Sequence, residues 1–520
     1  MQNQFLRFNF SLIIIILLGM STSGQSQISK PRWGEELKEP KGKDAFCKLI
    51  NMDDQYYQVL ESTPKSLKLF TYKTTSHVLQ REDELDFEAG TKRFFLPEVV
   101  KTKTGTFGVF NHYDKYARRQ SIHVSELVDH RFTDMKEIYD HTYKIKWKFW
   151  RHGIRQYTDE DAEGYRISPD SNRVAFINSL STEEDKNTQQ ANIVVLDDQM
   201  NLLWQRVHDF SGSDKDLGFD DILIDNQGTI FILAKRFKEK KEIREANRKD
   251  KLMPDYKYVI FEITQDNMLE HEIKLNGAAI PVDATISFSD ENKEEYSITG
   301  LYTDEKKKSK IKGTFFLSHD NSIAELHPFT TKWLEDIADE RDKKKGIGLS
   351  ELFEIQQSVV FSDGTVGMIT EKVLTSIDSP AGSKMSTISY HSRDLFVSLF
   401  SQEGELIKYV KLPKYFINGD YRHKSFFGTL HNDELFLFYN EFLDRKERKA
   451  IGKGGMSTIY INYAKINSKG DLRKKHLFAN DDSGWGLNPK QVLKYQNRLI
   501  MCSHKRKKYA FVTAKFREKK

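Results

Sequence analysis

The side chains best suited to bind a ligand form two basic groups, one in the segment 236–256 and the other in the segment 443–458. Both segments are long and polar and lack strand periodicity. Cationic side chains gathered on one surface attract anions such as acidic polysaccharide, lipid headgroups or an acidic protein. Because glutamates interrupt both runs, a solvated loop without a ligand is the alternative. The candidate binding residues are Lys238, Lys240, Lys241, Arg244, Arg248, Lys249, Arg445, Lys446 and Arg448.

Aspartates form a second group of candidates. The segment 209–225, DFSGSDKDLGFDDILID, brings Asp214, Asp216 and Asp220 close together, and carboxylate oxygens are ligands that Ca²⁺ prefers. The spacing lacks the EF-hand ligand set and its terminal glutamate. The segment 478–489 has the same acidic character. We therefore expect an ordinary capped turn in each segment, with no metal and no other cofactor.

The catalytic motifs that a sequence can reveal are missing. The 15 histidines occur in no HExxH motif, and no G-x-S-x-G nucleophile elbow is present. We therefore assign no catalytic residue and favour a binding protein over an enzyme. Cys47 and Cys502 lie near opposite ends of the chain. In an oxidising compartment they form a disulfide if the chain ends meet, and otherwise they are two buried thiols.

The N-terminus indicates export. Arg7 precedes a short apolar run from Phe10 to Met20, and the small residues Gly24 and Ser26 follow it. The run is too short to span a bilayer as a helix. We expect residues 1–26 to be a signal peptide cleaved near Ser26, which directs the protein to the periplasm or the outside of a bacterium. A retained membrane anchor is the alternative; no later segment is apolar enough to cross a membrane.

The balance of charge argues against a nucleic-acid-binding protein. The chain has 81 basic and 76 acidic residues, so the net charge of +5 is small. No set of aromatic residues for base stacking alternates with the basic residues. The expected partner is a protein or an acidic glycan, bound by a monomer.

Repeated hairpins must position these side chains. Two apolar strands flank a tight turn at LIDNQGTIFILAKR, and VFSDGTVGMITEKV repeats the pattern. Eight such hairpins occur, at 47–62, 99–113, 166–179, 223–236, 286–302, 360–373, 428–442 and 492–504. A second kind of hairpin, whose last strand is polar, follows at 67–87, 193–210, 258–275, 313–329, 395–412 and 459–478. Two hairpins together predict one four-stranded antiparallel sheet, with the polar strand at its edge.

Tandem four-stranded sheets are typical of a β-propeller. The turns DNQGTI (225–230) and SDGTV (362–366) resemble the D-x-x-G-x-[IVL] turns of the β-propeller superfamily, in particular exported bacterial proteins with TolB-like or WD40-like blades. The resemblance covers most of the chain and implies a fold, not an activity. The segments SPDSNRVAF and SDGTVGM lack the aromatic end of an Asp-box, so sialidase activity is not implied.

We therefore predict an all-β propeller of eight four-stranded blades. The last unit has three evident strands, so the segment 28–40 is expected to supply its fourth strand and close the ring. The domains are then a signal peptide (1–26), an N-terminal segment (27–44) and one propeller (45–518). Seven blades is the alternative, because the region 115–160 fits the pattern poorly and suggests a short helix and an aromatic plug. Two stacked sandwiches are a further alternative.

The long loops fall on one face. With blade strands named a to d, the b–c loops and d–a crossings share one face, here called the b–c face, and the a–b and c–d turns share the a–b face. The long insertions at 236–256, 373–394 and 443–458 are b–c loops. Loops that grow on a rigid scaffold usually carry function. We expect an exported binding or scaffold protein that uses its b–c face; a glycan-acting hydrolase or lyase and a structural envelope component are the alternatives.

Overall fold

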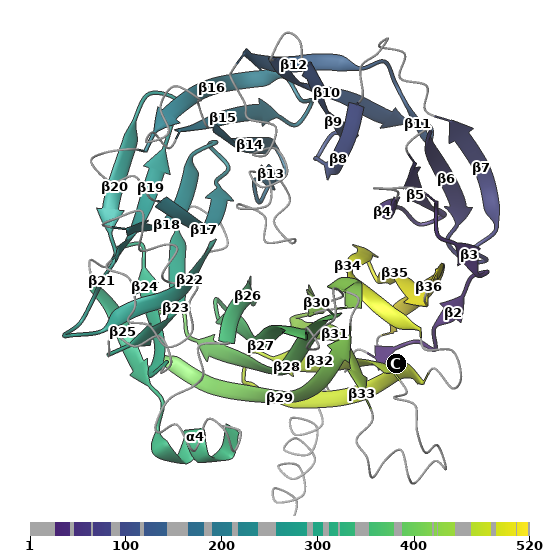
Figure 1. Cartoon of the computed structure of the whole chain (residues 1–520). Coiled ribbons are helices and arrows are strands. Elements are labelled where there is room, and N and C mark those ends of the chain that lie inside the picture. Colours follow the sequence, from purple (N-terminus) through teal and green to yellow (C-terminus); the bar gives the residue numbers. More distant parts are fainter. Residues whose placement is uncertain are drawn as a thin grey trace, which may run out of the picture.

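The computed structural model forms a closed ring of eight antiparallel sheets, each of which is one blade of a β-propeller (Figure 1). The first strand of each blade lies on the inner side of the ring and the last on the outer side. The predicted fold class and the count of eight blades are thereby confirmed. The structure describes residues 27–41, 46–63, 66–84, 94–114, 119–142, 165–180, 190–210, 217–237, 256–288, 295–304, 311–320, 323–337, 353–378, 387–418, 421–423, 425–442, 459–479, 485–505 and 507–517.

Blades 1 to 4 follow one another along the chain. Blade 1 contains β4 (Phe46–Met52), β5 (Tyr56–Ser62), β6 (Leu67–Lys73) and β7 (Leu79–Glu84). Blade 2 contains β8 (Phe94–Lys101), β9 (Thr106–Asp114), β10 (Arg119–Val128) and β12 (Lys136–Thr142), with the short β11 (Arg131–Phe132) beside β10. Blade 3 contains β13 (Tyr165–Ile167), β14 (Arg173–Leu180), β15 (Gln190–Asp197) and β16 (Leu202–Asp209). Blade 4 contains β17 (Leu217–Ile224), β18 (Ile230–Phe237), β19 (Tyr256–Ile263) and β20 (Met268–Glu272).

Blades 5 to 8 complete the ring. Blade 5 contains β22 (Ile280–Phe288), β23 (Tyr296–Thr303), β24 (Gly313–Ser318) and β25 (Ile323–Pro328), with β21 (Lys274–Leu275) parallel to β25. Blade 6 contains β26 (Phe353–Val360), β27 (Val366–Asp378), β28 (Thr387–Phe400) and β29 (Leu406–Asn418). The prediction of a long b–c loop at 373–394 is wrong: β27 and β28 continue into this segment and pair from Val373 with Ser392 to Asp378 with Thr387, because its β-branched residues favour strand. Blade 7 contains β30 (Phe426–His431), β31 (Glu434–Phe442), β32 (Ile459–Asn467) and β33 (Leu472–Ala479). Blade 8 contains β34 (Gly486–Tyr495), β35 (Arg498–Lys505) and β36 (Lys508–Arg517).

The N-terminal segment closes the ring, as predicted. The short strands β1 (Gln27–Ile28), β2 (Arg32–Trp33) and β3 (Leu37–Lys38) all pair antiparallel with β36 (Figure 1). The alternative of seven blades is wrong, because β10 and β12 complete blade 2 within the region that fitted the pattern poorly. The described part of this region, 119–142, contains strands and turns and no helix. The remaining segments, 115–118 and 143–160, in which the helix and the aromatic plug were also expected, lie outside the described residues.

Turn chemistry explains why one chain contains two near-copies of the same hairpin. Asp225 Oδ1 accepts a hydrogen bond from the backbone N–H of Thr229 at 2.7 Å, and Gly228 adopts a φ of +93°. In the second copy Phe361 stands at the position of Asp225, and Asp363 Oδ1 accepts the hydrogen bond from the backbone N–H of Thr365 at 3.0 Å; Gly364 has a φ of +81°. A positive φ is easily reached only by glycine. Each copy is therefore the a–b turn of one blade.

The hydrophobic core lies between neighbouring blades. For example, Ile193 and Val195 of blade 3 pack against Ile230, Ile232 and Phe261 of blade 4, and all five are fully buried. Each blade has apolar side chains on both faces of its sheet, so each face must be covered by another blade. The closed ring provides a neighbouring blade on each side. The described helical elements are α4 (Thr331–Ile337) and the single turn η1 (Tyr421–His423). Among the described residues no helix is long and apolar enough to cross a membrane.

Candidate functional site

The basic residues selected from the sequence all lie outside the described residues: Lys238, Lys240, Lys241, Arg244, Arg248, Lys249, Arg445, Lys446 and Arg448. The base of the first loop is described. There Lys235 lies 2.8 Å from Asp220, and Arg236 forms an ion pair with Glu270 at 2.5 Å. The first loop therefore leaves the blade next to a group of charged side chains.

A β-bulge in the inner strand of blade 4 shapes this group. Phe219 pairs with Ala234 and Asp221 with Leu233, so Asp220 is an extra residue between them. A bulge breaks the alternation of side chains between the two faces of a strand. As a result Asp220 contacts its own blade, while the carboxylate of Asp221 reaches blade 5. Asp220, expected in the turn of a blade crossing, lies instead within strand β17.

Asp220, Lys235 and Tyr258 form the centre of the candidate site. The Tyr258 hydroxyl donates a hydrogen bond to Asp220 Oδ2, and Lys235 Nζ lies 5.0 Å from the centre of the Tyr258 ring. Lys235 Nζ is also 6.0 Å from the ring of Tyr256. The side chains of Asp220 and Lys235 are each 17% exposed, so they are largely enclosed but still accessible to solvent.

The electrostatics of the site bring the pKa of Asp220 closer to neutral pH. Burial raises the pKa of Asp220 to about 6; Lys235 opposes this shift and Asp283 adds to it. Burial likewise raises the pKa of Asp283. Burial alone would lower the pKa of Lys235, but the two carboxylates outweigh it and raise that pKa. One ammonium group therefore faces two carboxylates, and a titrating group near neutral pH is typical of functional sites.

Other carboxylates at the inner rim have a structural role. Asp221 Oδ2 accepts hydrogen bonds from Thr285 Oγ1 at 2.6 Å and from the backbone N–H of Ile286 at 3.2 Å. Asp283 Oδ2 accepts one from the backbone N–H of Ile355 at 2.8 Å. In both cases the carboxylate follows a bulge and ties its blade to the next one. The function of Asp221 and Asp283 as interblade links leaves Asp220 as the candidate functional carboxylate.

A second charged cluster lies between blades 6 and 7 and is closed to solvent. Lys414 Nζ contacts Glu371 Oε1 at 2.5 Å and Ser392 Oγ at 2.6 Å, and Ser425 Oγ donates to Glu371 Oε2 at 2.6 Å. The side chains of Glu371 and Lys414 are both 0% exposed. A serine beside a lysine is one arrangement of a catalytic nucleophile and its general base. Because no substrate reaches a fully buried pair, we interpret this cluster as structural.

A cysteine, a histidine and a glutamate form a third chain of contacts. Cys502 Sγ lies 3.2 Å from His504 Nε2, and His504 Nδ1 lies 3.2 Å from Glu39 Oε1. Arg422 also contacts Glu39, at 2.5 Å. Burial raises the pKa of the Cys502 thiol, whereas a catalytic cysteine needs a lowered pKa and an accessible thiol. The chain of contacts therefore fastens the N-terminal segment to blade 8.

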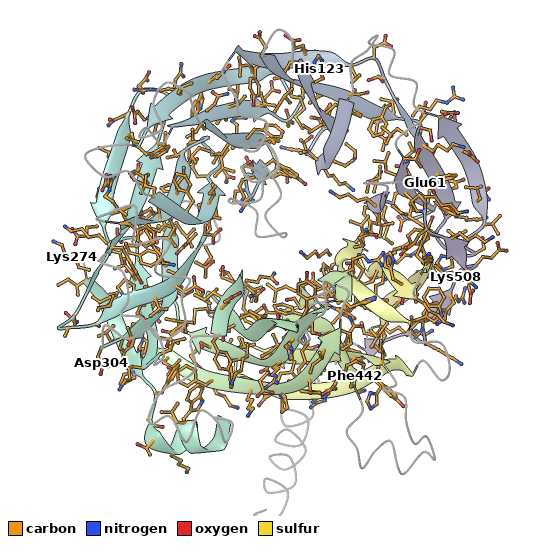
Figure 2. The ribbon with its side chains drawn as sticks, viewed as in Figure 1. Glu61, His123, Lys274, Asp304, Phe442 and Lys508 are labelled. Carbon is orange, nitrogen blue, oxygen red and sulfur yellow. The ribbon has the colours of Figure 1, made fainter. Side chains whose placement is uncertain are left out.

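The structure contains no candidate metal centre within the described part of the chain, where no three His, Cys, Asp or Glu side chains converge. Asp214 and Asp216 lie outside that part, and Asp220 is bonded to Lys235 and Tyr258. Cys47 and Cys502 are both buried, and in this structure both are in the reduced thiol form. Charged groups away from the candidate site, such as Lys274 and Asp304, lie at the outer edge of the ring (Figure 2).

Comparisons with known proteins leave the activity open. No protein-family model matches the chain. A search of curated proteins found no match. Solved structures with a similar arrangement include protein lmo1340 from Listeria monocytogenes (10% identity, 79% of this chain and 89% of that one, TM-score 0.37). A second is the Dos1 propeller (7% identity, 93% of this chain and 95% of that one, TM-score 0.41). A third is an oligogalacturonate lyase in complex with manganese (8% identity, 95% of this chain and 99% of that one, TM-score 0.38). Similarities this weak carry no argument about ligand or reaction.

Asp220 was predicted only as a possible metal ligand, and its contacts with Lys235 and Tyr258 were not predicted. Lys235 and Tyr258 are adjacent to it only because β17, β18 and β19 pair in register. One local signal was present. The strand LGFDDILI has two adjacent aspartates where a regular half-buried strand would alternate polar and apolar residues, and such an interruption is typical of a bulge.

Proposed function

We propose that the protein is an exported, monomeric binding or scaffold module that contacts a protein or acidic glycan with its b–c face. The observation that carries this proposal is the partly exposed Asp220–Lys235–Tyr258 cluster beside the first basic loop. Polar groups that remain accessible on a rigid frame suit recognition of a ligand. Export rests on the expected signal peptide. Because β1 begins at Gln27, removal of residues 1–26 leaves every ring-closing strand in place.

A pull-down from envelope extract tests the proposal. The mature chain, starting at Gln27, is compared with Asp220→Asn, with Lys235→Met and with a variant whose loop lysines and arginines at 238–251 and 445–453 are neutralised. Lys465→Met is the matched control, because Lys465 and Glu434 form a similar enclosed ion pair at 2.6 Å on the a–b face. We expect salt-sensitive capture that the first three variants weaken and the control preserves. Equal capture by all variants would rule out this contact surface.

A second candidate function is acid–base catalysis on a glycan. Asp220, with its pKa raised to about 6 by burial and its hydrogen bond from Tyr258, has the protonation behaviour of a general acid or base. Turnover of an acidic oligosaccharide that Asp220→Asn abolishes and Lys465→Met retains would favour this enzyme over the binding module. If neither capture nor turnover is found, the remaining alternative is a structural envelope component.

A further inference from the structure

Both cysteines of the chain lie where the ring closes. Cys47 is in β4, the inner strand of blade 1, and Cys502 is in β35 of blade 8. They belong to one cluster of buried side chains that joins the two blades, and their exposed fractions are 7% and 0%. Glu61 of blade 1 and Lys508 of blade 8 mark the two sides of this interface in Figure 2. The N-terminal segment pairs with blade 8 at the same place.

The contacts of the two thiols meet on one pair of residues. Cys502 Sγ lies 3.2 Å from His504 Nε2. His504 is the cross-strand partner of Tyr509, and the Tyr509 hydroxyl is hydrogen-bonded to the Cys47 thiol. Cys47 and Cys502 also pack in the same buried cluster as Tyr509 and Phe511. Folding therefore brings together two thiols that are far apart in the sequence.

We propose that Cys47 and Cys502 form a disulfide that closes the ring covalently when the chain folds in an oxidising compartment. The oxidant is an external disulfide, either of a thiol-oxidising protein or of a small thiol. The proton of Cys502 passes to His504 Nε2, and the thiolate attacks the external disulfide, forming a mixed disulfide and releasing one thiolate. Cys47, after losing its proton, attacks the Cys502 sulfur and releases the second thiolate. Two protein thiols are oxidised and one external disulfide is reduced to two thiols.

Burial determines when this reaction takes place. It raises the pKa of the Cys47 thiol to about 12, so the closed, reduced ring contains very little thiolate near neutral pH. Oxidation must then occur before blade 8 meets blade 1, or through transient opening between them. We expect the folded, reduced protein to react slowly with oxidised glutathione and the refolding chain to react quickly. The disulfide is thus a product of ring closure in the compartment to which the chain is exported.

Thiol counting in denaturant tests the proposal directly. The mature protein is refolded with oxidised glutathione, or purified from the periplasm, without reductant. We expect no free thiol, a monomer on a non-reducing gel and a Tm that falls by several degrees after reduction. Cys47→Ser and Cys502→Ser should each leave one free thiol and show the Tm of the reduced protein. Two free thiols in the wild-type protein, or a disulfide-linked dimer, would overturn the proposal.

The outcome is separate from that of the proposed function. Neither cysteine belongs to the Asp220 site, so the double variant Cys47→Ser/Cys502→Ser should capture the same partner as the wild-type protein. Two free thiols in the wild-type protein, together with retained capture, would overturn only the covalent closure. A disulfide without capture would overturn only the binding function. The thiol count on the unmodified sequence remains decisive even if a cysteine variant folds poorly.

Discussion

Among the described residues, enclosed ion pairs differ in their access to water. Glu371 and Lys414 are fully buried, and both make further hydrogen bonds to serines. Asp220 and Lys235 are partly exposed and face the additional carboxylate of Asp283. A buried ion pair whose hydrogen-bonding groups are all satisfied helps to specify one fold. A partly exposed ion pair, in which one ammonium group faces two carboxylates, is able to respond to a ligand or to pH.

The closed pair predicts a large loss of stability on removal of one partner. Lys414→Met leaves the Glu371 carboxylate buried without its counter-ion, which should lower the free energy of unfolding by about 3–5 kcal/mol. Denaturant titration measures this loss. Lys411→Met is the control, because Lys411 lies 3.7 Å from Asp394 with both side chains 25% exposed, and should cost at most about 1 kcal/mol. Equal losses in the two variants would contradict the structural role of Lys414.

The open pair predicts a pH-dependent stability. The pKa of Asp220 rises from 3.8 to about 6 on folding, so between these pH values the folded protein binds more protons than the unfolded chain. Stability must therefore fall as pH rises from about 4 to about 6. Asp220→Asn removes this component, so the Tm difference between wild type and variant should be more favourable to the wild type at pH 4 than at pH 7. Parallel Tm curves would show that Asp220 does not titrate in this range.

Bulges and the closing segment are the decisive features at the scale of elements. The hairpins followed from the sequence because turn residues and apolar alternation are local signals, as the Asp225 and Asp363 turns show. The bulge at Asp220 did not, because a bulge exists only relative to the strand that pairs with it. The same holds for the link from Asp283 to Ile355, which joins residues far apart in the sequence.

The closing segment predicts a deletion effect. A mature chain that begins at residue 41 lacks β1, β2 and β3, so β36 becomes an unpaired edge and Glu39 no longer contacts Arg422. We expect its Tm to fall by several degrees and its proteolysis to accelerate. Deletion of residues 518–520 is the control and should change neither. A chain without the segment that is as stable as the intact one would show that β36 needs no closing partner.

At the scale of the whole molecule, the ring explains why function is expected on one face. Antiparallel strands send the a–b and c–d turns to one side, where short turns such as the one at Asp225 are closed by their own hydrogen bonds. The insertions in blades 4 and 7 leave from the opposite side, and in blade 6 that side carries the extended ends of β27 and β28 in place of the predicted long loop. The number of blades and the side of the long loops followed from the sequence, whereas the contents of the site depended on contacts between strands and between blades.

Hydrogen–deuterium exchange with the captured partner tests the central claim, that the b–c face is the contact surface. The mature protein is measured alone and with saturating partner. We predict slower exchange at the ends of β18 and β19 nearest the first basic loop, around Lys235 and Tyr256, with no change at the a–b turn around Gly228. Protection confined to the a–b and c–d turns would contradict the claim and place the contact on the a–b face.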